Sequence, residues 1–131
     1  MPLLRQKGAT VVPEELLTRI YLAGPYSHKD ERVRKFRAKM IDKKYAELIN
    51  QGFCVFSPIS HSHTLVDFLP FESREWDFWK KQDYTHLMTC QELHVFCLPG
   101  WNKSRGVNDE IRWAVDAGMK IVFHTKWKGL I

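Results

Sequence analysis

The chain has 131 residues, of which 44% are hydrophobic, and it carries a formal charge of +5 at pH 7. This length suits one domain, and this share of apolar side chains is enough to bury a core, which argues against a disordered chain. The positive surplus is spread along the sequence and forms no basic arm. It therefore favours a small phosphate-bearing ligand, and nucleic-acid binding is not expected.

The sequence shows no sign of membrane insertion or export. No run of residues approaches the roughly 20 apolar residues of a membrane span, and the first residues lack the pattern of a secretory signal. The three cysteines, Cys54, Cys90 and Cys97, form no CxxC pair and have no metal-ligand spacing, so reduced thiols are expected. These features predict a cytoplasmic protein that contacts no membrane.

Strand-like and helix-like segments alternate along the chain. Residues 1–17 lack a hydrophobic period and are expected to form a flexible lead-in to a single domain at 18–131. The predicted elements are a strand at Arg19 to Gly24, a helix from its N-cap Asp30 to Gly52, a strand at Phe53 to Phe56, a helix at Trp76 to Thr89, a strand at Leu93 to Leu98, a helix beginning near Val107, and a strand at Lys120 to His124. Residues 57–75 are expected to form a polar loop. This alternation favours a Rossmann-like α/β fold, an open parallel sheet flanked by helices.

Small and polar residues collect in the segments that follow the predicted strands, where open parallel sheets bind their ligands. The candidate binding residues are Gly24, Pro25, Tyr26 and Ser27 after the first strand, His61 and His63 after the second, and Trp101, Ser104 and Gly106 after the third. The indole of Trp101 suits stacking on a nucleobase. A plain turn at Gly24 and core packing of Trp101 are the structural alternatives.

A helix start follows the third of these strands. Ser104 and Gly106 precede the helix, whose unpaired N–H groups predict a small cradle for an anion, with an ordinary serine N-cap as the alternative. Glu110 lies one turn into the helix beside its apolar face and is expected to be partly buried. Asp109 is expected to face solvent and to serve the helix dipole.

Asp83 lies in the preceding predicted helix and, taken alone, would be a surface acid. Together with Glu110 it forms the two-carboxylate arrangement that cleaves glycosidic bonds, in which one acid attacks the anomeric carbon and the other moves a proton. His61 and His63 have no further ligands at matching spacing, so no metal is expected. No cofactor is expected either, since the carboxylates carry this chemistry.

Three motifs resemble the nucleoside deoxyribosyltransferase superfamily, in particular its small uncharacterised phage and bacterial members. They are "YLAGPYS" at 21–27, "LPGWNKSRGVNDEIRWA" at 98–114 and the closing strand "KIVFH" at 120–124. The resemblance implies that Glu110 is the nucleophile that attacks C1′ of a sugar and that Asp83 helps the base to leave. It also implies that Tyr21 and Gly24 line the pocket for the sugar and phosphate.

Ser104 distinguishes two branches of that superfamily. Its transferases for free nucleosides commonly carry Asp here, whereas its nucleoside 5′-monophosphate N-hydrolases carry Ser, because a carboxylate repels phosphate and a hydroxyl donates to it. The resemblance therefore implies an N-hydrolase that releases the base from a nucleoside or deoxynucleoside 5′-monophosphate. A base-exchanging deoxyribosyltransferase is one alternative, and a nucleotide-binding module without chemistry is another, which the presence of two acids disfavours.

Other features of the resemblance concern assembly and specificity. Superfamily members are usually homodimers or larger assemblies, which implies that the tail at 125–128, with an exposed Trp127, contacts a partner. Gln91 departs from the pattern, since many members have an acid there. The loop at 98–104 is longer than in the well-studied hydrolases, which leaves the identity of the base open.

Overall fold

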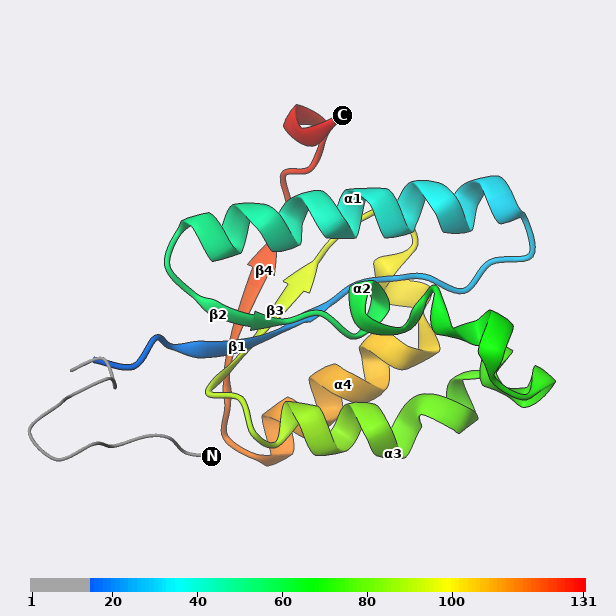
Figure 1. The fold of residues 1–131 in the computed structure, drawn as a ribbon. Coiled ribbons are helices and arrows are strands. Elements are labelled where there is room, and N and C mark those ends of the chain that lie inside the picture. Colours follow the sequence, from blue (N-terminus) through cyan, green and yellow to red (C-terminus); the bar gives the residue numbers. More distant parts are fainter. Residues whose placement is uncertain (1–14) are drawn as a thin grey trace, which may run out of the picture.

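The computed structural model describes residues 15–131 and shows a parallel four-stranded sheet between two helix layers (Figure 1). The strands are β1 (Arg19–Ala23), β2 (Cys54–Phe56), β3 (Glu92–Phe96) and β4 (Lys120–His124), in the spatial order β2-β1-β3-β4. The helices are α1 (Glu31–Asn50), α2 (Pro58–Ser62), α3 (Trp76–Leu87) and α4 (Arg105–Asp116). All strand pairs are parallel, which confirms the predicted Rossmann-like fold.

Successive side chains of the central strands point to opposite faces of the sheet. Tyr21 of β1 and Val95 of β3 pack with Leu87 of α3 and Val107 of α4 in one core cluster. The other cluster joins the opposite faces of β1 and β3 to α1 through Ile20, Leu22, Phe96, Met40, Ile41 and Leu48. The helix α1 therefore covers one face, while α3 and α4 cover the other (Figure 1).

The first helix begins and ends where the sequence predicts. The Asp30 side chain accepts a hydrogen bond from the backbone N–H of Arg32 at 2.9 Å, so it is the N-cap. Gly52 follows the last turn with a φ of +99°, a left-handed conformation that glycine adopts without strain and that ends helices.

Several boundaries, each by one or two residues, and one loop differ from the prediction. The predicted polar loop at 57–75 contains α2 and two 3₁₀ turns at Leu65–Phe68 and Phe71–Arg74. These elements are too short to show a helical period in the sequence. The strand β3 lies at Glu92–Phe96 instead of Leu93 to Leu98, and α4 begins at Arg105 instead of near Val107, because Ser104 is its N-cap.

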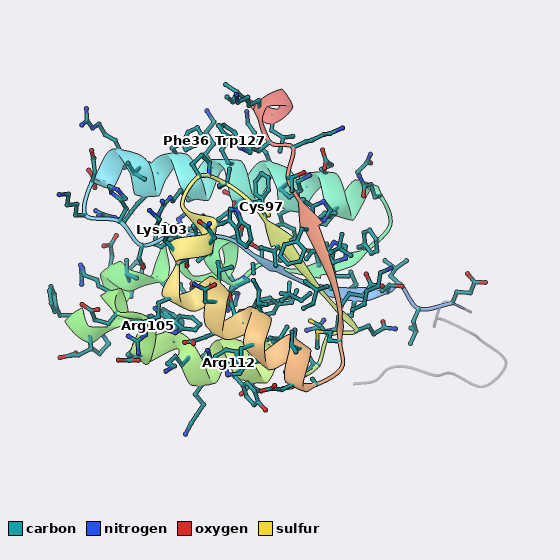
Figure 2. The ribbon with its side chains drawn as sticks, turned by 180° about the vertical axis from the view of Figure 1, so that it is seen from behind. Phe36, Cys97, Lys103, Arg105, Arg112 and Trp127 are labelled. Atoms are coloured by element: carbon teal, nitrogen blue, oxygen red, sulfur yellow. The ribbon has the colours of Figure 1, made fainter. Side chains whose placement is uncertain are left out.

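The C-terminal tail packs against its own chain. The ring of Trp127 meets Phe36 of α1 edge-on with 6.2 Å between centroids, and Lys43 Nζ donates to the carbonyl of Leu130 at 2.6 Å. Figure 2 shows Phe36 and Trp127 together above the sheet. The prediction of an exposed Trp127 was therefore wrong, because α1 offers this indole an apolar surface within the same chain. Contact between the tail and a partner stays a prediction.

Further predictions concern the cysteines, the membrane and the lead-in. All three cysteines are free, with Cys90 and Cys97 buried and Cys54 exposed. Within residues 15–131, no helix is long and apolar enough to cross a membrane. Most of the predicted lead-in, residues 1–14, lies outside the described residues.

Candidate functional site

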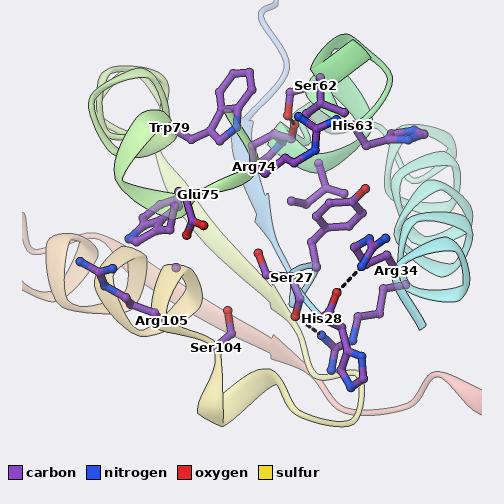
Figure 3. A pocket seen from close by; sticks show the side chains of 18 of the residues that line it. Ser27, His28, Arg34, Ser62, His63, Arg74, Glu75, Trp79, Ser104 and Arg105 are labelled. Carbon is purple, nitrogen blue, oxygen red and sulfur yellow. Dashed lines mark hydrogen bonds between the residues drawn. The ribbon is translucent and has the colours of Figure 1, made fainter. Parts of the chain in front are cut away.

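The candidate site lies at the carboxyl edge of the sheet, where β1 and β3 are neighbours. The chain runs from β1 into α1 and from β3 into α4, so the two connections go to opposite faces of the sheet. Open parallel sheets bind ligands at such a change of direction. A cavity of about 1160 Å³ lies here, large enough for a nucleotide-sized ligand. Figure 3 shows the side chains around it.

Glu110 and Tyr21 form a buried pair beneath this cavity. Tyr21 points from β1 toward the layer of α3 and α4, and its hydroxyl donates a hydrogen bond to Oε2 of Glu110. Glu110 lies one turn into α4, lines the cavity and is only 4% exposed. The structure thus confirms the predicted burial of Glu110 and gives its carboxyl group a fixed orientation.

Burial also changes the protonation of this pair. Removal from water raises the pKa of Glu110 well above its ordinary value, and the nearby charge of Asp83 adds to the effect. The hydrogen bond from Tyr21 acts in the opposite direction, because it stabilises the carboxylate. Burial likewise raises the pKa of the Tyr21 hydroxyl, so this hydroxyl keeps its proton and remains a hydrogen-bond donor to Glu110.

Asp83 is the second buried acid of the cavity. It lies on α3 and lines the same cavity as Glu110. Burial raises its pKa to about 7, while the Tyr21 hydroxyl partly offsets the shift. A carboxyl group with such a pKa can both give and accept a proton near neutral pH. The prediction that Asp83, taken alone, is a surface acid was wrong, because the residue is buried.

The start of α4 forms another wall of the cavity. Ser104 lines it and also accepts a hydrogen bond from the N–H of Val107 at 3.2 Å, so the serine is an N-cap in this structure. Gly106 lies against the indole of Trp76, and an added Cβ would come within 3.3 Å of that ring. Close packing between α3 and α4 therefore favours a glycine at this position.

Basic side chains outnumber acidic ones around the cavity. The basic lining residues are Lys29, Arg34, Lys35, Arg37, Arg74, Lys103 and Arg105, and the acidic ones are Glu31, Asp67, Glu75, Asp83 and Glu110. Two of these acids have raised pKa values, so the balance of charge is more positive than the count suggests. Such a cavity favours an anionic ligand. Arg105 is held by an ion pair with Asp77 at 2.8 Å.

Arg37 connects the loops that follow β1 and β3. Its guanidinium donates to the carbonyl of Ser27 at 2.9 Å and to that of Pro99 at 3.2 Å. Gly100 has a φ of +92°, and an added Cβ would come within 2.6 Å of the Arg37 guanidinium. A single α1 side chain thus sets the relative position of both loops.

The structure brings most of the predicted site residues to the cavity. The predicted residues that line it are Gly24, Tyr26, Ser27, His63, Asp83, Ser104, Gly106 and Glu110. Tyr21 lies beneath the cavity and contributes through its bond to Glu110. Among the predicted binding residues, Pro25, His61 and Trp101 do not line it.

These three residues have structural roles instead. Pro25 is buried. The ring of His61 packs against Phe56 with 5.4 Å between centroids. Trp101 packs against the core on the α4 side and lies 5.7 Å from the ring of Phe123. The prediction that Trp101 stacks on a nucleobase was therefore wrong, because the turn at the start of α4 directs its indole toward the sheet.

The tryptophans that line the cavity are two others. Trp76 and Trp79 of α3 both line the cavity, and the Trp79 Nε1–H is fixed by the carbonyl of Ser73 at 2.7 Å. The Trp76 Nε1–H donates to Asp109 Oδ2 at 2.7 Å. Asp109 is therefore buried under Trp76, and the prediction that it faces solvent was wrong.

Many other lining residues were not predicted from the sequence, among them Arg34, Arg37, Ser73 and Arg74. Arg34 and Arg37 lie in the first turns of a charged helix, where spacing alone does not show which cations face the sheet edge. Ser73 and Arg74 lie in the segment predicted as a loop. The available signal was the position of Arg34 and Arg37 in the first two turns of the helix that follows the Gly-Pro turn after β1.

Metal binding was not expected from the sequence. Within residues 15–131, no group of three or more histidine, cysteine, aspartate or glutamate side chains is placed to hold a metal ion. His61 and His63 diverge, since His63 lines the cavity and His61 packs on Phe56.

Comparison with known proteins identifies the family. Residues 18–126 match the family described as "Domain of unknown function (DUF1937)", which covers β1 through β4. The chain belongs to this family, whose description carries no activity. No curated protein matches the sequence.

Proposed function

We propose that this DUF1937 domain cleaves the N-glycosidic bond of a nucleoside or deoxynucleoside 5′-monophosphate and releases the free base. The proposal is carried by one observation, the buried Glu110–Tyr21 pair at a basic cavity that Asp83 also lines. Buried acids with raised pKa values in a cavity are typical of catalytic sites. The motif resemblance to nucleoside deoxyribosyltransferases supports the same chemistry.

In the first step the Glu110 carboxylate attacks C1′ of the sugar while the C1′–N bond breaks. The electron pair of that bond leaves with the base, and Asp83 donates its proton to the departing base. The Tyr21 hydroxyl binds one carboxylate oxygen of Glu110, so the other oxygen is the attacking atom. Positive charge that develops on the sugar favours the ionised form of Glu110.

In the second step water attacks C1′ and displaces Glu110 as a carboxylate. The ionised Asp83 accepts the proton of that water, which restores both acids to their starting states. A second base that attacks in place of water would make the same site a base-exchanging transferase.

The phosphate of the substrate is expected at the start of α4. Ser104 can donate its hydroxyl hydrogen, and the N-terminal N–H groups of α4 favour an anion. Lys103 and Arg105 flank this position, and Figure 3 shows Ser104 and Arg105 on the same side of the cavity. Since its raised pKa reduces the charge on Asp83, a phosphate meets little repulsion from that acid.

The proposal is tested by release of base from a panel of nucleosides and their 5′-monophosphates, each with and without a second base. Glu110→Gln is expected to lower release by roughly 10³-fold or more, as for other nucleophiles. Asp116→Asn neutralises an exposed acid at the far end of the same helix and is the matched control. Equal release by wild type and Glu110→Gln, or no release from any substrate, would refute the proposal.

The expected setting is the cytoplasm, where free thiols such as those of Cys54, Cys90 and Cys97 persist. We also propose a homodimer or larger assembly, as in the resembling superfamily. The exposed rings of Phe68 and Phe71, in the segment that borders the cavity, are the surface that supports it. Light scattering of wild type and of a Phe68→Ser/Phe71→Ser variant is the test, with a smaller mass expected for the variant.

A further inference from the structure

Ser73 has a buried hydroxyl that the fold leaves without a partner. Its Oγ is the buried side-chain polar atom that has no hydrogen-bond partner within the described part of the chain. Ser73 is only 1% exposed and lines the cavity from the 3₁₀ turn that precedes α3. Buried hydroxyl groups nearly always have a partner, so an exception calls for a ligand or a functional reason.

The backbone around Ser73 is firmly held. The Ser73 N–H donates to the carbonyl of Pro70 at 2.9 Å, and the Ser73 carbonyl accepts from Trp79 Nε1 at 2.7 Å. The hydroxyl is thus unsatisfied in a residue whose backbone N–H and carbonyl both have partners. A misplaced backbone therefore does not explain why the Ser73 hydroxyl lacks a partner.

The neighbours of Ser73 on the cavity wall indicate what kind of group it meets. Trp79 and Asp83 are one turn apart on α3 and share a helix face, and both line the cavity with Ser73. Figure 3 places Trp79 on the side of the cavity opposite Ser27 and Ser104. The wall therefore combines an aromatic surface, a neutral hydroxyl and a proton-carrying acid.

This chemistry suits a nucleobase better than a phosphate. Aromatic rings stack on heterocycles, and a hydroxyl can both donate to and accept from the edge of a base. The carboxylate of Glu75 on the same wall would repel an anion. The nearest cation in sequence, Arg74, lies over the ring of Phe71 at 5.0 Å.

We propose that Ser73 reads the nucleobase, with its hydroxyl hydrogen-bonded to the edge of the heterocycle that lies against Trp79. The inference rests on the proposed function for the ligand class and adds the residue that determines base preference. It also orients the substrate, with the base on the α3 wall beside Asp83 and the phosphate at the start of α4.

The unliganded protein provides a first test. Ser73→Ala removes an unsatisfied hydroxyl, so its melting temperature should equal or exceed that of wild type. Ser57 is the matched control, because it is 2% exposed and its hydroxyl bonds to that of Ser60 at 2.9 Å. Ser57→Ala should lower the melting temperature, since it removes a partnered group that also caps α2.

Ligand affinity is the decisive measurement. In a Glu110→Gln background, which prevents turnover, calorimetry would measure binding of the monophosphates of adenosine, guanosine, cytidine and uridine, and of ribose 5-phosphate, which has no base. Ser73→Ala should weaken at least one nucleotide about tenfold, as expected for one hydrogen bond, and leave ribose 5-phosphate unchanged. Ser57→Ala should leave all affinities unchanged.

The inference is overturned if Ser73→Ala binds every nucleotide as tightly as its parent. It is also overturned if the variant weakens ribose 5-phosphate and the nucleotides equally, or if the parent binds no nucleotide. The proposed activity fails separately: Ser73-dependent nucleotide binding without any base release would refute the activity alone. Base release that depends on Glu110 but whose base preference is unaltered by Ser73→Ala would refute only the inference.

Discussion

At the scale of single residues, the site is defined by acids placed where burial opposes their charge. Two effects act on the pKa of Glu110 in opposite directions: burial raises it and the hydrogen bond from Tyr21 lowers it. Asp83 has a pKa of about 7 for the first of these reasons. A nucleophile needs the ionised form and a proton donor needs the neutral form, so each acid has its own dependence on pH.

Tyr21→Phe removes the hydroxyl that stabilises the Glu110 carboxylate. The pKa of Glu110 should then rise further, so the acidic limb of the pH–rate profile for base release should move to higher pH. Activity at pH 6 is expected to fall roughly tenfold or more, and less at pH 8. Tyr84→Phe, which changes an exposed ring on α3 that does not line the cavity, is the control. An acidic limb that stays in place would contradict the assigned role of Tyr21.

Asp83→Asn removes the proposed proton donor. In wild type, base release should fall as the pH rises through about 7, because Asp83 loses its proton there. The variant should lose roughly 10²-fold or more of the activity, and its residual rate should lack this alkaline limb. A full pH–rate profile of both proteins measures the effect. An unchanged alkaline limb in the variant would assign it to another group.

At the scale of elements, the start of α4 combines helix capping with the proposed phosphate site, and one substitution separates the two. Aspartate is as good an N-cap as serine, so Ser104→Asp should melt as wild type does, whereas Ser104→Ala should lose about 1 kcal/mol of stability. The new carboxylate should lower cleavage of monophosphates tenfold or more and spare free nucleosides. Calorimetry and the base-release panel check both parts. Full activity of Ser104→Asp on monophosphates would exclude phosphate binding at this position.

Elements with a strong sequence pattern could be predicted, and short ones could not. The period of apolar residues and the Asp30 cap located α1, and the apolar runs located β1 and β4. The segment 57–75 was missed because its helical pieces are four or five residues long. In the site, Glu110 and Asp83 could be predicted from spacing and resemblance. The roles of Trp101 and Ser73 could not, because packing decides which indole faces the cavity and which hydroxyl lacks a partner.

At the scale of the whole molecule, the buried site acids should oppose stability at neutral pH. The folded protein binds the Asp83 proton more tightly than the unfolded chain does, because the pKa is about 7 in the fold and about 4 in model peptides. Asp83 therefore contributes stability below pH 4, and this contribution is lost as the pH rises toward 7. Its upper bound is about 4 kcal/mol. His124 acts oppositely, since burial lowers its pKa to about 4 and its contribution is lost as the pH falls.

Asp83→Asn should accordingly change stability in a pH-dependent way. The melting temperature of the variant minus that of wild type should be more positive at pH 8 than at pH 4.5, since the variant buries no titratable group at this position. Thermal unfolding across this range measures the difference. Asp116→Asn, at an exposed position, should show no such trend. A constant difference between wild type and Asp83→Asn would mean that Asp83 is not desolvated.

The two hydrogen bonds from Arg37 to the loops after β1 and β3 limit where this scaffold can be redesigned. Because one guanidinium holds Ser27 and Pro99 together and Gly100 leaves room for it, a change in the length of either loop would disturb the other. These loops are poor places for insertions. The segment from His63 to Glu75 lines the cavity without this tie. Libraries that seek new substrates for this scaffold should therefore diversify that segment and leave the two tied loops intact.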